Sequence, residues 1–243
     1  MAKLRSSNIE PSTGTTLALG ASGDAALISS DSIKSNTWQD VGANSLWVSN
    51  GSGTLSNINS SLAGSGGFTL LYENSYASNS TADFSSTYIN NTYDEYWFVM
   101  TNMRPNTDSV TLEFNGSTDN GSNYNVIKTT TFFSGQHGEG GANGQLNYGS
   151  TVDLAQSTAF QSLGGGLGND ADQSSNGILK LFSPGNTTYI KCFTYIGNFS
   201  QENNYTMNPF VAGYFTTATA VNAIRFKMSS GSFHGYIELY GIS

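Results

Sequence analysis

The chain has 243 residues, a length that suits one large all-β domain or a small domain with an appendage. Charged residues make up only 11% of the chain and aromatic residues 12%, so the sequence can bury a core and is not of the disordered type. The net charge is −8 and the nine basic residues are dispersed, which argues against a nucleic-acid partner.

Ser, Thr and Asn fill most of the polar positions, and these residue types favour strands and turns over helices. No apolar run is long enough to span a bilayer, so membrane insertion is not expected. The N-terminal sequence MAKLRSSNIEPSTG contains no apolar stretch of the kind found in signal peptides. We therefore expect the protein to assemble in the cytoplasm of the cell that makes it.

Residues 1–67 differ in composition from the rest of the chain. A few apolar residues stand among Ser, Thr, Gly and Ala, and a Gly/Ser tract follows over 50–67. This segment has too little apolar surface to fold alone, so it is either flexible or ordered by packing against other chains. Trp38 and Trp47 favour the second alternative, because a mobile linker has little use for tryptophan. The sequence thus predicts an extended N-terminal anchor arm and spacer.

Residues 68–243 alternate between short apolar-rich runs and turn residues. Two packed antiparallel sheets in a jelly-roll-like β-sandwich account for this pattern with the fewest assumptions. In AIRFKM (223–228), for example, three apolar side chains are expected to point inward while Arg225 and Lys227 meet water. The predicted strands are 68–72, 96–100, 110–114, 125–133, 178–182, 189–196, 210–215, 223–228 and 236–242.

The stretch FNGSTDNGSNY (114–124) raises the question of a binding loop, since Asp119, Asn120 and Ser122 could surround an ion or a sugar. It offers only one acidic oxygen donor group, however. Its two Asn-Gly pairs instead suit a hairpin between the strands 110–114 and 125–133, because Asn and Gly accept positive φ. We interpret it as a turn at an exposed end of the sandwich.

A long Gly-rich loop is predicted over 134–176, with a helical turn near 152–160. Its glycines lack the strand–loop–helix context of a nucleotide site, so we expect no bound cofactor. His137 and Glu139 in this loop, and His234 before the last strand, have no GxSxG motif to join. No catalytic residue is predicted.

Three further groups of residues are candidate sites. Asn169, Asp170 and Asp172 have a spacing that calcium tolerates, but they lack the Gly and Glu of an EF-hand loop, so no metal site is predicted. Asp94 and Glu95 precede a strand, and a glycosidase would need a second carboxylate across a cleft. The single Cys192 excludes an intrachain disulfide and lies in an alternating run, where it is predicted to be a small core residue.

Aromatic side chains could stack on sugar rings, but most Phe and Tyr residues lie on predicted strands and are explained first by core packing. The alternative that stays open is a glycan-binding surface on the loops 74–91 or 201–208.

Four segments resemble a family of small structural proteins of marine tailed bacteriophages, cyanophages especially. They are RSSNIEPSTGTTLALGASGDAALIS (5–29), YDEYWFVMTNMRPNTDSVTLEFNGSTDNGSNYN (93–125), NGILKLFSPGNTT (176–188) and SSGSFHGYIELYGIS (229–243). Residues 31–67 carry no such likeness. These motifs belong to the fold and contain no catalytic pattern, so no active site follows from the resemblance.

The resemblance implies a virion surface protein, usually a homotrimer, whose N-terminal arm anchors to other virion proteins while the C-terminal sandwich projects outward. We expect a non-enzymatic tail appendage, such as a tail fibre or tail-tip protein, that contributes to attachment to a host surface glycan. The alternative within the same class is a capsid decoration protein that stabilises the head. A carbohydrate-active depolymerase, relying on Glu139, Asp170 or Asp172, and a secreted lectin are the alternatives from other classes.

Overall fold

The structure, a computed structural model, describes residues 37–39, 45–49, 55–56, 67–141 and 144–243. The chain divides into two units, Met1–Ala63 and Gly64–Ser243. In the first unit, β1 (Thr37–Gln39), β2 (Ser45–Ser49) and β3 (Leu55–Ser56) form an antiparallel sheet in that order. Most of the predicted anchor arm lies outside the described residues, so its extended form stays a prediction.

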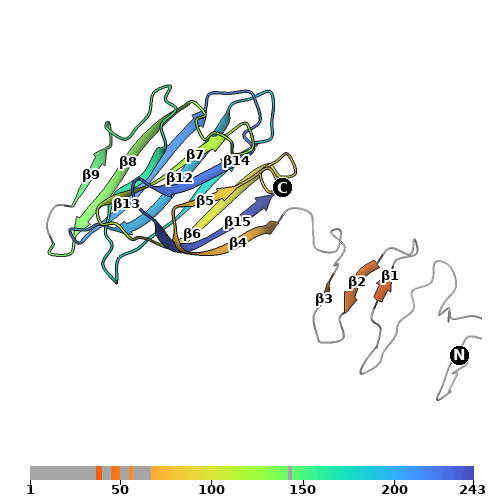
Figure 1. Cartoon of the computed structure of the whole chain (residues 1–243), viewed down its shortest axis with the longest axis horizontal. Helices are drawn as coiled ribbons and strands as arrows, with labels where there is room; N and C mark the ends of the chain where they lie inside the picture. Colours follow the sequence, from red (N-terminus) through yellow and green to blue (C-terminus); the bar gives the residue numbers. More distant parts are fainter. Residues whose placement is uncertain (1–36, 40–44, 50–54, 57–66, 142–143) are drawn as a thin grey trace, which may run out of the picture. The chain divides into compact units, whose positions relative to one another are not determined.

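The second unit consists of two antiparallel sheets (Figure 1). One has four strands in the order β10-β7-β14-β5, and the other has eight in the order β4-β15-β6-β11-β12-β13-β8-β9. The strands are β4 (Phe68–Asn79), β5 (Thr81–Phe84), β6 (Glu95–Pro105), β7 (Val110–Ser117), β8 (Lys128–Gly138), β9 (Gln145–Tyr148), β10 (Gln161–Leu167), β11 (Ser175–Phe182), β12 (Lys191–Ser200), β13 (Tyr205–Phe215), β14 (Ala223–Met228) and β15 (Phe233–Ile242).

The strand pairs are nested along the chain. β4 pairs with β15, β5 with β14, β6 with β11 and β7 with β10, and all four pairs are antiparallel. The two members of each successive pair thus lie closer together in the sequence. The remaining strands β12, β13, β8 and β9 extend the larger sheet beyond β11.

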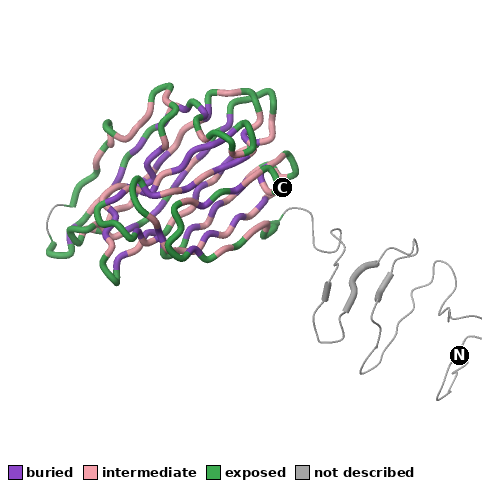
Figure 2. The backbone as a smooth tube through the Cα atoms, viewed as in Figure 1, coloured by how far each residue is buried: buried purple, intermediate pink, exposed green. Residues whose placement is uncertain are grey.

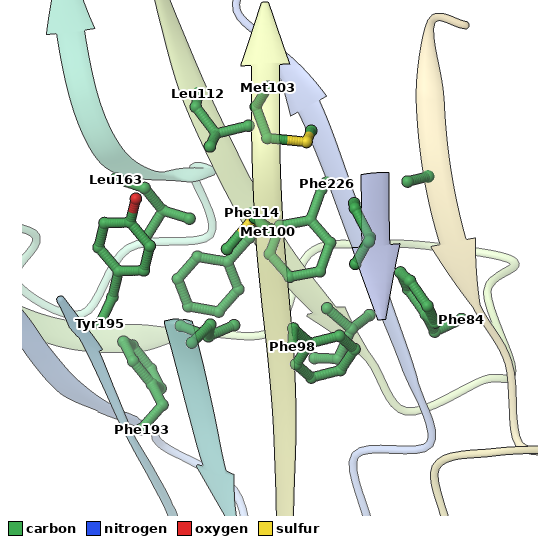
Figure 3. Packing of buried hydrophobic residues seen from close by; sticks show 14 of the residues in the cluster. Phe84, Phe98, Met100, Met103, Leu112, Phe114, Leu163, Phe193, Tyr195 and Phe226 are labelled. Carbon is green, nitrogen blue, oxygen red and sulfur yellow. The ribbon is translucent and has the colours of Figure 1, made fainter. Parts of the chain in front are cut away.

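The core lies between the two sheets and is rich in aromatic residues (Figure 3). Phe114 of the four-stranded sheet meets Phe193 of the eight-stranded sheet edge to face, with 5.0 Å between ring centroids. Phe84 and Phe98 make a similar contact across the sheets, also at 5.0 Å. Edge-to-face contacts of this kind add to the free energy gained from burying the rings. Burial alternates along most strands, as expected for sheets with one face on the core (Figure 2).

The predicted fold class is confirmed, since the described unit is an all-β antiparallel sandwich. Each of the nine predicted strands is present, and β14 has the bounds predicted from the sequence, 223–228. The prediction of a long loop over 134–176 is wrong, because this range contains the end of β8 and all of β9 and β10. The predicted helical turn at 152–160 is absent. A turn over 149–153 overlaps the start of this range, and the chain after it is irregular.

The prediction of a hairpin over 114–124 is also wrong. This segment is not a hairpin, because β7 and β8 belong to different sheets and the segment carries the chain from one sheet to the other. The positive φ values are present at Asn120 (57°) and Gly121 (87°), as the sequence indicates. Asp119 serves the loop itself, accepting hydrogen bonds from the Ser117 hydroxyl at 2.6 Å and the Asn123 side chain at 2.7 Å. These hydrogen bonds lower the pKa of Asp119 to about 2.

Candidate functional site

The structure does not gather His137 and Glu139 into a site. β8 and β9 pair antiparallel, and after the end of β8 the Gly141 amide donates a hydrogen bond to the Gly138 carbonyl at 3.0 Å. Both side chains are exposed there. Within the described residues, no group of three or more His, Cys, Asp and Glu side chains is arranged to hold a metal ion.

The carboxylates singled out in the sequence have local roles or stand alone. Glu95 accepts a hydrogen bond from the Trp97 indole at 2.9 Å, and the Asp94 backbone bonds to Ile242 and Ser183. Asn169 is tied to the β6–β7 connection, where its amide donates to the Asp108 carboxylate at 3.1 Å. 

Two predicted candidates from distant parts of the sequence do come together. Asp172 and His234 line one cavity of about 510 Å³, which also contains Arg104. The segments 74–91 and 201–208, which the sequence analysis treats as loops and leaves open as a glycan surface, contain parts of β4 and β13 and all of β5, and they do not line this cavity. 

The most extensive exposed feature is on the outer face of the eight-stranded sheet, the face away from the core. A row of apolar side chains crosses six neighbouring strands, each residue directly opposite the next. From β6 to β9 the row consists of Val99, Ile178, Ile196, Phe210, Phe133 and Tyr148. We call these six residues the outer row.

The outer row is open to solvent over its central and β9 parts. Ile196 is 53% exposed, Phe133 40% and Tyr148 60%. The rings of Phe133 and Phe210 stack almost in parallel, with 4.8 Å between centroids and 4° between planes. A ladder of directly opposed aromatic and branched side chains stabilises the sheet, but it leaves a broad apolar surface in water.

Cys192 lies on this same face, which contradicts the prediction that it is a core residue. The alternation of β12 is as expected, but Phe193 and Tyr195 face the core, and their neighbours therefore point outward. Cys192 is exposed and lines a shallow apolar hollow of about 450 Å³ with Thr194, Ala212 and their neighbours.

The outer face also has an aromatic cluster at its β4 side. Phe68 packs edge to face on Trp97 at 4.8 Å and on Tyr240 at 6.0 Å. The Lys180 ammonium lies 3.7 Å from the centre of the Trp97 ring, a cation–π contact. Apolar side chains therefore occur on this face from β4 to β9.

Sequence reasoning missed this surface because it attributed the aromatic residues to the core. The available signal was that 96–100 is apolar on both faces, and that 189–196 has apolar residues at odd and at even positions. A two-layer sandwich buries only one face of each sheet, so a strand that is apolar on both faces has one apolar side left for a partner.

In the part of the chain that the structure describes, no helix is long and apolar enough to cross a membrane. No protein-family model matches the chain, and neither a curated protein nor a solved structure is significantly similar to it.

Proposed function

We propose that the chain is a non-enzymatic structural component of a tailed-bacteriophage virion, a homotrimeric tail appendage that contributes to host attachment. The observation that carries the proposal is the outer row, an apolar surface across six strands. Surfaces of this kind favour association with another protein, because contact removes the apolar area from water. A closed oligomer of identical subunits is the simplest assembly that covers it.

The position of the family likeness supports this proposal. Three segments that resemble phage structural proteins lie in the sandwich: 93–125 contains β6 and β7, 176–188 contains most of β11, and 229–243 contains β15. Of these strands, three are neighbours in the eight-stranded sheet, in the order β15-β6-β11. With the exception of β7, which belongs to the four-stranded sheet, the likeness within the sandwich therefore falls on neighbouring strands.

We further infer that the sandwich is a jelly roll with insertions. The four nested pairs involve eight strands in two sheets, which is the strand count and arrangement of that fold, and jelly rolls occur in viral capsid and lectin domains. The four added strands carry Ile196, Phe210, Phe133 and Tyr148, most of the outer row. In this interpretation the insertions supply the surface through which subunits associate.

The subunit association is tested by measuring the mass of the purified full chain by sedimentation velocity. We expect three times the chain mass for the wild type and the mass of one chain for the double variant Ile196→Glu/Phe210→Glu. The single Cys192 provides a second measurement. Its thiol should react slowly with a maleimide in the wild-type oligomer and rapidly in the double variant, because the subunit contact would cover this face.

Tyr189→Glu is the matched control, since Tyr189 is 70% exposed but lies in the connection between β11 and β12, outside the outer row. This variant should keep the trimer mass and slow labelling. A wild-type chain that sediments as a monomer at micromolar concentration and labels rapidly would overturn the oligomer.

The place on the particle is tested with antibodies against the purified chain and electron microscopy of the phage that encodes it. We expect labelling at the tail and a block of adsorption by the antibody. Labelling over the head, with normal adsorption, would support capsid decoration instead. Particles without label would refute a virion component, and steady cleavage of host polysaccharide by the purified chain would support a depolymerase.

A further inference from the structure

We propose that the cavity lined by Arg104, Asp172 and His234 binds a carboxylate-bearing saccharide, such as a hexuronate unit of an acidic glycan. The cavity has a volume of about 510 Å³ and is completed by Asn102, Ala171, Gln173 and Ser174. This volume is within the usual range for small-ligand sites, roughly 300–1,000 Å³. The inference rests on the proposed attachment role for its biological meaning, and on the cavity alone for its chemistry.

A bulge in β6 forms one wall of the cavity. Opposite β11, the pairing shifts between Met103↔Ser175 and Met100↔Gly177, and opposite β15 it shifts between Arg104↔His234 and Thr101↔Tyr236. In both cases β6 has one residue more than its neighbour. Bulges of this kind redirect side chains and are frequent beside binding sites.

The bulge is held in place by specific contacts. Asn102 has a φ of 52°, and its backbone N–H donates to the Asn176 side chain at 2.9 Å. Gly235 lies opposite with a φ of 151°, and a Cβ there would come within 2.9 Å of the Met103 Cα. Because the backbone is fixed in this way, Arg104 and His234 stand side by side at the cavity.

The facing wall is a short anchored turn. The Gln173 amide bonds to the Asp170 carbonyl at 3.0 Å, and the buried Gln173 side chain donates to the Gln201 carbonyl at 3.0 Å. The Gln173 side-chain oxygen also accepts from the Asp170 amide at 3.2 Å. The turn is therefore held to the sandwich from inside, while Asp172 stays exposed at the rim.

Arg104 is the described cation with the weakest protein partner. Its only hydrogen bond within the described residues is a long one, 3.4 Å from Nη1 to the Ala171 carbonyl. Arg225 and Lys227 form ion pairs with Asp83 and Glu113. Of the remaining three, Lys128 and Lys191 donate to backbone carbonyls, and Lys180 lies over Trp97. A guanidinium has five N–H donors, so most of those on Arg104, which lines the cavity, have no acceptor among the described residues.

These groups match a sugar acid more closely than other small anions. The guanidinium fork accepts a carboxylate in a bidentate pair. The Asp172 carboxylate makes no hydrogen bond within the described residues, so it can accept from sugar hydroxyls, and it would repel a doubly charged phosphate. The flat His234 ring beside Arg104 offers a surface for the apolar face of a pyranose. A single hexuronate unit, which has one charge and several hydroxyl groups, matches all three side chains.

The test is isothermal titration of the purified full chain with digalacturonate and, as the neutral counterpart, galactobiose. We expect binding of digalacturonate only, at least tenfold weaker in Arg104→Gln, in line with the loss of a charge-assisted pair. Lys180→Gln is the matched control, because it removes one positive charge from the same sheet outside the cavity, and it should bind like the wild type.

Asp172→Asn separates recognition from a structural effect. It should weaken digalacturonate binding several-fold but strengthen binding of a phosphorylated galactobiose, because the carboxylate that repels the doubly charged phosphate group is gone. As a measurement independent of variant folding, amide chemical shifts of the wild type should move at 102–104 and 172–174 on addition of digalacturonate.

Equal binding of digalacturonate by Arg104→Gln and Lys180→Gln, equal binding of the neutral and acidic sugars, or no shift at these amides would overturn the proposal. Binding of a C-terminal peptide carboxylate in preference to the sugar would overturn it too. None of these results bears on whether the chain is on the virion, which the antibody experiment decides separately.

Discussion

Two lysines are fully buried at one end of the sandwich. Lys128 begins β8 and Lys191 begins β12, and both stand opposite Phe215 of the intervening strand β13. Neither faces a carboxylate partner within the described residues. Lys128 donates to the carbonyls of Val126 and Ala159, and Lys191 to those of Tyr189 and Ala218. Each ammonium therefore fastens irregular chain to the end of the sheet.

Burial without an ionic partner lowers the pKa of Lys128 to about 7 and lowers that of Lys191 as well. The unfolded chain keeps an ordinary lysine pKa near 10.4. Between these two values the unfolded state binds more protons than the folded state. The contribution of Lys128 to the free energy of unfolding therefore rises with pH across this window, and it is constant below it.

We predict that Lys128→Met removes this pH dependence. The free energy of unfolding of the variant relative to the wild type should fall as the pH rises from about 7 to 9.5, by at most about 1.4 kcal/mol per pH unit. Urea titrations at several pH values measure it. Lys191→Met should show the same sign. If the free energy of unfolding of the wild type and of Lys128→Met changed in parallel with pH, the lowered pKa of Lys128 would be contradicted.

The pairing of β11 with β12 depends on two glycines that face each other. Gly177 and Gly197 are directly opposite, and the buried Tyr195 ring lies over both. A Cβ on either glycine would come within 2.6 Å of the Tyr195 Cζ. The strands can thus keep their register around a large buried ring only because neither position has a side chain.

Gly197→Ala is therefore expected to destabilise the protein by about 2 kcal/mol, since overpacking a filled core has this order of cost. Denaturant unfolding followed by fluorescence measures the change. Gly135→Ala is the matched control, because it lies on a strand of the same sheet with open space around the added methyl group. An unchanged midpoint for Gly197→Ala would show that β11 and β12 can shift to admit the methyl group.

At the level of elements, a strand with clean apolar–polar alternation can be predicted from the sequence, whereas a glycine-rich strand cannot. AIRFKM alternates cleanly, and its pattern predicts the bounds of β14 to the residue, whereas the pattern of QSLGGGL (β10) predicts a loop. Gly164 in this strand is required by close packing, because Phe199 lies where its side chain would be. Such contacts come from distant parts of the chain, so no local pattern announces them.

At the level of the molecule, the same limit applies to the candidate sites. The two-layer sandwich can be predicted from the number of apolar strands in the sequence. The outer row cannot, because it depends on which face of each strand meets the core. The cavity brings Arg104, Asp172 and His234 together from three separate segments through the register of β15, β6 and β11. The sequence indicates Asp172 and His234 as candidates but not Arg104, because the lack of an ion-pair partner for Arg104 among the described residues exists only in the folded chain.

The division into two units allows a last prediction about the whole molecule. The core residues of the described chain all lie between Tyr76 and Leu239, within the Gly64–Ser243 unit. We therefore expect residues 64–243 alone to unfold cooperatively, with the same denaturant midpoint as the full chain. This fragment should also sediment at three times its own mass, because the outer row lies within it. A piece that folds with the full midpoint but sediments as a monomer would assign the subunit contact to residues 1–63, and the Ile196→Glu/Phe210→Glu variant of the full chain would then remain trimeric.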